Sequence, residues 1–319
     1  MKTKSLAKSL LITAIFLGAL IVWVQFSSYS SLKDVKDGSH SVFDVPEFKY
    51  LISKPECSRD SSTPYFVTLV LSKPSRFERR IASRDTWAHS DPRTKTYFLM
   101  GMVESPILKK RIIVEEAKFK DIIQGNFVDS YRNKTYKHTM ALKWFSENCP
   151  HVKYLLKLDD DVFPNIPAIH QYLVSSAQYG AYIHGIKGNR TVVREGKRKI
   201  KPEEFNHDQF PEYVDGSAAI YPSTFVREAL KKTLTTPFFW MDDVYISGII
   251  RKKLNAKIIS ISHLKLTTNT LYKIGNGTLT TLPRPMFLVT QHKRKYEDAL
   301  KLWEMTESYR HAHNIYLKT

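Results

Sequence analysis

The chain alternates short apolar runs with longer stretches in which apolar residues recur three or four positions apart. Short runs bounded by turn residues predict buried strands, here at 65–71, 96–100, 154–158, 181–185, 219–221 and 256–261. The longer spacing predicts helices, here at 77–87, 107–119, 137–147, 166–175, 223–232 (capped by Ser223) and 243–253. Residues 187–209 are polar and charged and predict a loop. Strands that alternate with helices indicate an α/β domain with a mostly parallel sheet, in which ligands bind beyond the carboxyl ends of the strands.

The N-terminal segment has a different pattern. Residues 9–32 carry no charged side chain, and an apolar helix of about 20 residues crosses a bilayer. Lys2, Lys4 and Lys8 precede it and predict that the N-terminus stays in the cytosol. We therefore expect a cytosolic tail at 1–8, a transmembrane signal anchor at 9–32, a stem at 33–62 and a lumenal domain at 63–319. A cleaved signal peptide is the alternative, and the length of the apolar run favours the anchor.

Composition narrows the class of partner. The 319 residues are 42% hydrophobic and 12% aromatic, which excludes a disordered chain. Lys and Arg number 49 against 31 Asp and Glu, and the net charge of +18 favours polyanions, anionic membranes or phosphorylated small molecules. The basic residues are scattered, so a solvated basic surface explains them equally well. A lumenal location argues against nucleic acid as the partner.

Two further features bear on the compartment. Glycosylation sequons begin at Asn133, Asn189 and Asn276, as in proteins of the secretory pathway. Cys57 and Cys149 are the only cysteines, so the chain is no disulfide scaffold. One bridge or two free thiols both remain open.

Three consecutive carboxylates follow the predicted strand 154–158. Asp159 and Asp161 project to the same side of an extended chain, and Asp160 projects away from them. Two hard carboxylates suit Mg²⁺ or Mn²⁺, whose coordination is completed by waters and a substrate diphosphate. The alternative is a solvated acidic turn that caps the next helix.

A second acidic pair, Asp242 and Asp243, opens the predicted helix 243–253. Capping is the ordinary role for such residues. The chemical role is that of a general base, because a neighbouring carboxylate raises the pKa of one member of a pair. His263 and His292 follow apolar segments, and either could add a nitrogen ligand to a metal site.

Taken together and in order, several blocks of the sequence resemble the β-1,3-galactosyltransferase family (glycosyltransferase family 31). The resemblance extends from about Tyr65 to Trp303. The blocks are Arg79-Arg-Ile-Ala-Ser-Arg-Asp-Thr-Trp87, Phe98-Leu-Met-Gly101, Phe127-Val-Asp-Ser-Tyr131, Lys157-Leu-Asp-Asp-Asp-Val-Phe163 and Asp242-Asp-Val-Tyr245. Asp242 stands where the family usually has Glu, and Val214 occupies a position that is often Cys. Cys149 would then lack its usual partner, which leaves a bridge to Cys57 or a free thiol.

The resemblance implies a fold and an activity. It implies a GT-A type nucleotide-sugar domain in a single-pass type II protein of the Golgi membrane. The implied reaction is inverting transfer of a hexose from a UDP-sugar to a glycan of a glycoprotein or glycolipid, most simply by a β-1,3-galactosyltransferase. A β-1,3-N-acetylglucosaminyl- or N-acetylgalactosaminyltransferase is one alternative, and an inactive lumenal glycan-binding or chaperone relative is another.

The same resemblance assigns roles to individual residues. Asp243 is the expected base, and Asp242 orients it or tunes its pKa. Asp161 and His292 are expected to bind Mn²⁺ (or Mg²⁺), with Asp159 at the metal or the ribose. The expected nucleotide-sugar contacts are Arg80, Arg84, Asp129, Lys137, Asp159 and Asp160. For the two arginines, structural ion pairing is an equal alternative.

Overall fold

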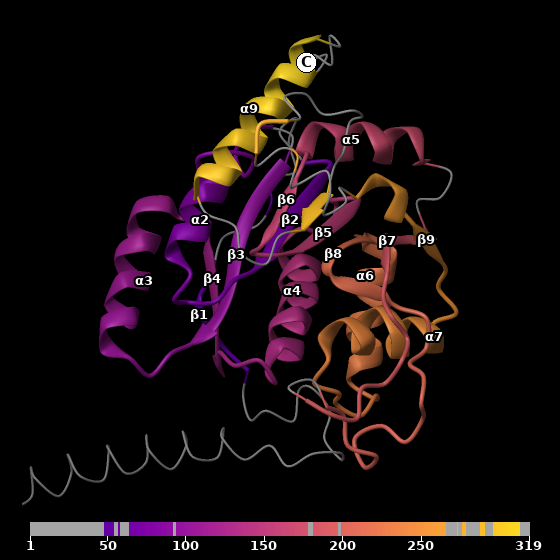
Figure 1. Ribbon diagram of the computed structural model, residues 1–319. Helices are drawn as coiled ribbons and strands as arrows, with labels where there is room; N and C mark the ends of the chain where they lie inside the picture. The colour runs from indigo at the N-terminus through magenta and orange to yellow at the C-terminus, as the bar shows by residue number, and fades with distance from the viewer. Residues whose placement is uncertain are drawn as a thin grey trace, which may run out of the picture.

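The computed structural model describes residues 48–53, 57, 64–91, 94–177, 181–196, 199–265, 273, 276–278, 288–290 and 296–312. Their centre is an eight-stranded mixed sheet in the order β1-β4-β3-β2-β5-β8-β7-β9 (Figure 1). The strands are β1 Tyr50–Ile52, β2 Phe66–Leu71, β3 Thr94–Met102, β4 Ile122–Val128, β5 Tyr154–Asp159, β7 Ile183–Lys187, β8 Val214–Pro222 and β9 Ile258–Ser260. The β1–β4, β5–β8 and β7–β8 pairs are antiparallel and the other four pairs are parallel. A separate antiparallel pair joins β6 Val162–Pro164 to β10 Leu288–Thr290.

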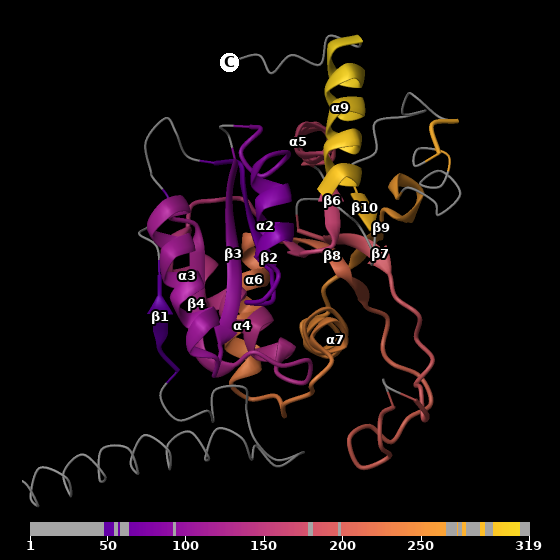
Figure 2. The same cartoon turned by 60° about the vertical axis from the view of Figure 1, so that its left-hand side comes forward.

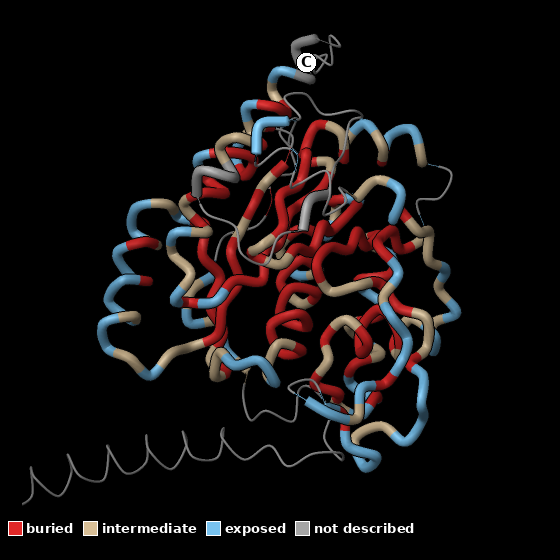
Figure 3. The backbone as a smooth tube through the Cα atoms, viewed as in Figure 1, coloured by how far each residue is buried: buried red, intermediate tan, exposed pale blue. Residues whose placement is uncertain are grey.

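Helices cover both faces of the large sheet (Figure 2). They are α2 Phe77–Arg84, α3 Pro106–Phe119, α4 Lys134–Asn148, α5 Ile166–Ser175, α6 Ser223–Thr233, α7 Arg251–Lys253 and α9 Tyr296–Ala312. Successive side chains of a strand point to opposite faces. Val67 and Leu69 of β2 therefore share a core with α4 and α6, while Phe66 and Val70 share the other core with α5 and α9. In Figure 3 the central strands and most of α4 are buried, and exposed residues gather on α3 and on the loop between β7 and β8.

The strands and helices expected from the spacing are confirmed, with ends that differ by a few residues. The elements not expected are β1, β4, β6, β10, α9 and the short 3₁₀ helix η3 Ser262–Leu264. The cap assigned to Ser223 is wrong, because Pro222 is the N-cap of α6 and makes no side-chain hydrogen bond. The last expected helix begins as a π-helix, η2 Val244–Ile250, before it continues as α7.

The domain reaches further toward the N-terminus than its expected start at residue 63. Strand β1 and Cys57 fall within the predicted stem, yet β1 pairs with β4 and Cys57 is bonded to Cys149. The expected anchor at 9–32 and the first part of the stem lie outside the described residues. In the part of the chain that the structure describes, no helix is long and apolar enough to cross a membrane.

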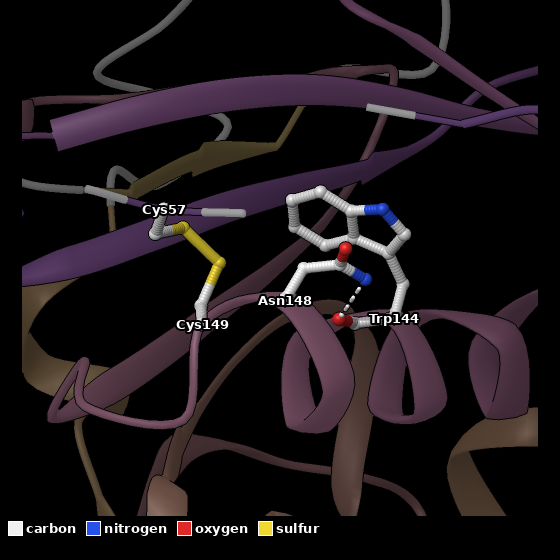
Figure 4. The surroundings of a disulfide bond; sticks show 4 residues. All are labelled: Cys57, Trp144, Asn148 and Cys149. Carbon is white, nitrogen blue, oxygen red and sulfur yellow. Dashed lines mark hydrogen bonds between the residues drawn. A yellow bond between two sulfur atoms is a disulfide. The ribbon is translucent and has the colours of Figure 1, made fainter. Parts of the chain in front are cut away.

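The disulfide between Cys57 and Cys149 settles the alternative left open by the sequence (Figure 4). The two Cα atoms are 5.0 Å apart, and both residues are buried. The backbone N–H of Cys57 also donates to the carbonyl of Asn148, at 2.7 Å. The bridge therefore fastens the segment before β2 to the carboxyl end of α4.

We expect the double variant Cys57→Ala/Cys149→Ala to lose about 4 to 5 kcal/mol of unfolding free energy. The reason is that the bridge closes a loop with a sequence separation of 92 residues, which restricts the unfolded chain. Urea unfolding measures this loss. A reductant should lower the stability of the wild-type protein similarly and leave the variant unchanged, and equal stability of all samples would contradict the expectation.

Candidate functional site

The candidate chemical residues meet at one edge of the large sheet. The four neighbouring strands β4, β3, β2 and β5 are parallel, so their carboxyl ends lie at the same edge of the sheet. There Leu71 of β2 is level with Asp159 of β5. Ser72 directly follows β2, Asp129 directly follows β4, and Asp159 is the last residue of β5. The first turns of α4 lie against the same edge, because Lys137 of α4 donates a hydrogen bond to the carbonyl of Ser72. This is the position at which open α/β sheets bind ligands.

Two lysines join the two acidic segments into one cluster, here called the ion quartet: Asp159, Asp242, Lys134 and Lys157. The Nζ atom of Lys134 lies 2.8 Å from Asp159 Oδ2 and 3.5 Å from Asp242 Oδ1. The Nζ atom of Lys157 lies 2.9 Å from Asp159 Oδ1 and 3.6 Å from Asp242 Oδ2. Each ammonium group therefore touches both carboxylates, and each carboxylate offers one oxygen to each lysine.

Asp159, Asp242 and Lys134 are charged at neutral pH although much of the ion quartet is buried. Burial alone would raise the pKa of Asp242 and of Asp159, but Lys134 and Lys157 outweigh it and hold both pKa values below their usual range. The two carboxylates in turn outweigh the burial of Lys134 and raise its pKa well above normal. The side chain of Lys157 is fully buried, whereas that of Lys134 is 26% exposed. The open side of the ion quartet is thus the side of Lys134.

His138 adds a fifth contact from the turn of α4 that follows Lys134. Its Nδ1 lies 2.9 Å from Asp242 Oδ2, and both side chains are buried. Burial lowers the pKa of His138, so the ring is neutral at pH 7. An ionised carboxylate only accepts hydrogen bonds, and therefore Nδ1 must carry the proton that is donated to Asp242.

Asp243 has a different environment from its neighbour. Its Oδ1 accepts from the backbone N–H of Val244 at 2.9 Å and its Oδ2 from that of Gly216 at 3.1 Å. The first bond caps η2, so the ordinary role foreseen for this pair is present. Burial, and then the charge of Asp242, raise the pKa of Asp243 to about 6. The pair thus consists of an anchored anion and a carboxyl that exchanges its proton near neutral pH.

Gly216 of β8 lies beside both Asp243 and Lys157, which β5 carries. A Cβ atom at this position would lie 3.1 Å from Asp243 Oδ2 and 3.4 Å from its Cβ. The carbonyl of Gly216 also accepts a hydrogen bond from Lys157. One small residue of β8 therefore contacts both the ion quartet and Asp243.

Asp160 and Asp161 turn toward the loop between β2 and α2. Asp160 accepts from Ser72 Oγ at 3.0 Å, from the Lys73 N–H at 3.2 Å, and from Arg76 and Arg79. Asp160 therefore points away from the ion quartet, as expected. Strand β5 ends at Asp159 and residues 160 and 161 form a turn, so Asp161 contacts Arg79 together with Asp160 and the expected placement of Asp161 beside Asp159 is wrong. Asp161 lies 3.7 Å from Arg79 and takes no part in the ion quartet.

Besides Asp159 and Asp160, the four residues expected to contact the nucleotide divide into two pairs. Lys137 and Asp129 form a buried pair at 2.7 Å, and Asp129 also accepts from the Gly101 N–H. This pair lies at the sheet edge. Arg80 and Arg84 lie deeper, and their guanidinium groups are directed into the protein.

Arg80 and Arg84 form structural ion pairs, the alternative to nucleotide contact. Arg80 and Arg84 both pair with Glu115 at 2.7 Å, and Arg84 also pairs with Asp121 at 2.8 Å. The side chains of both arginines are nearly inaccessible to solvent. Arg80 additionally donates to Ser72 Oγ and to the Lys73 carbonyl, and so supports the loop that holds Asp160.

The three sequons differ in their surroundings. The Nδ2 atom of Asn133, to which a glycan would be attached, donates to the Val128 carbonyl at 2.9 Å. This bond argues against modification of Asn133 in the folded protein. Asn189 and Asn276 are exposed.

The described residues at this edge offer only some of the ligands that a divalent ion needs. Among the described residues there is no group of three or more His, Cys, Asp and Glu side chains that could hold a metal. An ion at Asp159 would have to displace an ammonium group, whereas Asp161, outside the ion quartet, offers hard oxygen atoms that fit Mg²⁺ or Mn²⁺. Thr290 of β10 pairs with Val162, which follows Asp161. The expected ligand His292, two positions after Thr290, lies outside the described residues.

The residues missed by sequence reasoning are the basic partners of these carboxylates. Lys134 and His138 lie one helical turn apart on α4, and Lys157 lies two positions before Asp159 on the same side of β5. These spacings are visible in the sequence. That the two faces meet depends on tertiary packing.

Comparison with known proteins gives one family. Residues 78–262 match the family model described as "Galactosyltransferase". β-1,3-Galactosyltransferase 5 of Mus musculus is 26% identical over 315 residues, which cover 97% of this chain and 96% of the relative. β-1,3-Galactosyltransferase 2 of Homo sapiens is 24% identical over 282 residues, which cover 83% of this chain and 63% of the relative.

Solved structures give weaker similarities. The apo structure of the bifunctional glycosyltransferase WbbM is 11% identical, with a TM-score of 0.39 over 81% of this chain and 51% of that chain. Mouse xyloside xylosyltransferase 1 is 10% identical, with a TM-score of 0.36 over 72% of this chain and 98% of that chain. TM-scores of this size do not establish a shared fold.

The family match covers more than half of the chain and contains both acidic segments and all four members of the ion quartet. The resemblance seen in the sequence is thereby confirmed. This chain belongs to the galactosyltransferase family and is a glycosyltransferase.

Proposed function

We propose that this protein is an inverting β-1,3-galactosyltransferase that transfers galactose from UDP-galactose to glycan chains of glycoproteins or glycolipids. Relatives aligned along most of the chain carry the name β-1,3-galactosyltransferase. The observation that carries the proposal is Asp243, whose pKa is raised to about 6 beside the anchored anion Asp242. A base with a pKa close to the working pH is suited to deprotonate an acceptor hydroxyl.

Inversion needs a single in-line displacement. The acceptor oxygen forms a bond to the anomeric carbon of the donor sugar while the bond from that carbon to the diphosphate oxygen breaks. The electron pair of that bond leaves with the UDP, and the acceptor proton passes to Asp243. Asp242 stays ionised, because three donors hold it, and its charge helps to raise the pKa of the base. The backbone N–H groups of Val244 and Gly216 orient the base.

Among the residues that the structure describes, Asp161 is the carboxylate that would hold a divalent ion. His292 is proposed as the nitrogen ligand of that ion. When bound, such an ion neutralises negative charge on the departing diphosphate. Asp129 and Lys137 keep the loop after β2 in register with the edge, because Lys137 contacts both Asp129 and the Ser72 carbonyl. Their proposed role toward the nucleotide is to shape the pocket in which its uracil or ribose lies.

The proposal includes the fold type and the location. We propose a GT-A type domain, which the mixed sheet and family membership support. We also propose residence in the Golgi membrane through the anchor at 9–32, with the domain in the lumen. The apolar N-terminal sequence supports this orientation.

A panel of donors tests the proposed activity. The purified full-length protein should transfer galactose from UDP-galactose in the presence of Mn²⁺, and NMR of the product should show a β-1,3 linkage. Transfer of N-acetylglucosamine or N-acetylgalactosamine instead would reassign the donor. Absence of both transfer and hydrolysis with every UDP-sugar would favour an inactive glycan-binding or chaperone relative.

Asp243→Asn is the matched variant in that assay. It should lower kcat by about 10² to 10⁴-fold, because it removes the base while it keeps the size of the side chain. UDP binding should persist. Asp208→Asn, which changes a fully exposed carboxylate, serves as the control with unchanged activity. Loss of UDP binding in Asp243→Asn would assign this residue to the nucleotide site.

The pH profile gives a second test. A base must be ionised, so kcat/KM should fall about tenfold per pH unit below the pKa of Asp243, near 6, and should level off above it. Removing the neighbouring charge with Asp242→Asn should move this acid limb to lower pH. An acid limb at pH 4, or a limb that the variant does not move, would contradict the assignment.

A further inference from the structure

We infer that Lys134 binds the diphosphate of the donor nucleotide and keeps part of the donor affinity independent of a divalent ion. This inference rests on the proposed UDP-sugar donor. It concerns a residue to which the sequence analysis assigns no role, and it depends on how the two lysines of the ion quartet differ.

Lys157 is the structural lysine of the pair. Its side chain is fully buried, and its Nζ is directed to Asp159, to Asp242 and to the carbonyl of Gly216. Its hydrogen bonds go to Asp159 and to the Gly216 carbonyl, and Asp242 lies 3.6 Å from its Nζ atom. Because the side chain is fully buried, no ligand can reach the Nζ atom of Lys157.

Lys134 occupies the open side of the same ion quartet. Within the described part of the chain, its Nζ contacts the two carboxylates, at 2.8 and 3.5 Å, and no third acceptor. One proton is therefore left for a ligand, and a quarter of the side chain is exposed.

The charge at this edge explains why a diphosphate needs such a group. Asp159, Asp161, Asp242 and Asp243 bring four carboxyl groups to the ends of β5 and η2, which repel an anionic donor. Arg76 and Arg79 already pair with Asp160 on the other side of the edge. Lys134 can add a phosphate oxygen to its contacts without leaving the ion quartet, and an ammonium group binds phosphate as a point charge.

The test compares UDP with uridine, which lacks the diphosphate. Isothermal titration of the full-length protein in EDTA should show that Lys134→Met weakens UDP binding about 10- to 100-fold, the usual effect of losing a hydrogen bond to a charged group. Uridine binding should change less than about twofold, because the inferred contact is to the diphosphate, which uridine lacks. Mn²⁺ should reduce the loss of UDP affinity, and Lys134→Arg should restore most of it.

Two controls separate this effect from damage to the fold. Lys231→Met removes an exposed lysine on α6 and should leave both affinities unchanged. Because Lys134→Met leaves Asp159 short of a partner, the charge-balanced variant Lys134→Met/Asp159→Asn is compared with Asp159→Asn alone. The double variant should bind UDP about 10-fold or more weakly than the single variant.

Equal UDP affinities of wild-type protein and Lys134→Met would overturn the inference and leave the proposed function intact. A wild-type protein that binds UDP only with Mn²⁺ would do the same. A wild-type protein that binds no UDP under either condition would overturn both the inference and the proposed donor.

Discussion

The site depends on the attraction between two lysine ammonium groups and two aspartates that are distant in sequence. Burying an isolated charge is very unfavourable, and a buried ion pair is tolerated when each charge has several partners. The ion quartet meets this condition, because each lysine contacts Asp159 and Asp242 and His138 supplies a further donor to Asp242. Its closed arrangement holds the end of β5 against the start of η2.

The properties of Asp243 follow from that arrangement. Because Asp242 is kept ionised, its negative charge adds to burial in raising the pKa of the adjacent carboxyl. Gly216 links the ion quartet to Asp243, because its N–H donates to Asp243 and its carbonyl accepts from Lys157. The residues that position the proposed proton acceptor also hold the end of β5, which Asp161 follows two positions later. In this way the fold, the charges and the proposed chemistry are consequences of one cluster.

Sequence reasoning recovered the elements with strong periodicity and both acidic segments. It missed β4, whose sequence contains Gln124, Gly125 and Asn126, and β1, which is short and gains its stability by pairing with β4.

At the site, sequence reasoning assigned Asp243 by resemblance, and the structure adds the cause of its raised pKa. The roles of Lys134, Lys157 and His138 could not be predicted, because a lysine or histidine on a helix or strand face is ordinarily solvated or structural. Only the packing of α4 against the sheet edge shows which carboxylates they meet. For Arg80 and Arg84 the sequence left two alternatives, and burial beside Glu115 decides between them.

A double-mutant cycle between Lys157 and Asp242 tests most directly whether the two acidic segments are held together by shared ammonium groups. Each of Lys157→Met and Asp242→Asn leaves an unbalanced buried charge, whereas the double variant keeps the balanced pair of Lys134 and Asp159. In urea unfolding of the full-length protein, the loss of unfolding free energy in the double variant should therefore be smaller than the summed losses of the two single variants, by at least about 1 kcal/mol. Single effects that add to within about 0.5 kcal/mol would show that the two residues do not interact, and would contradict the convergence of the two segments in one site.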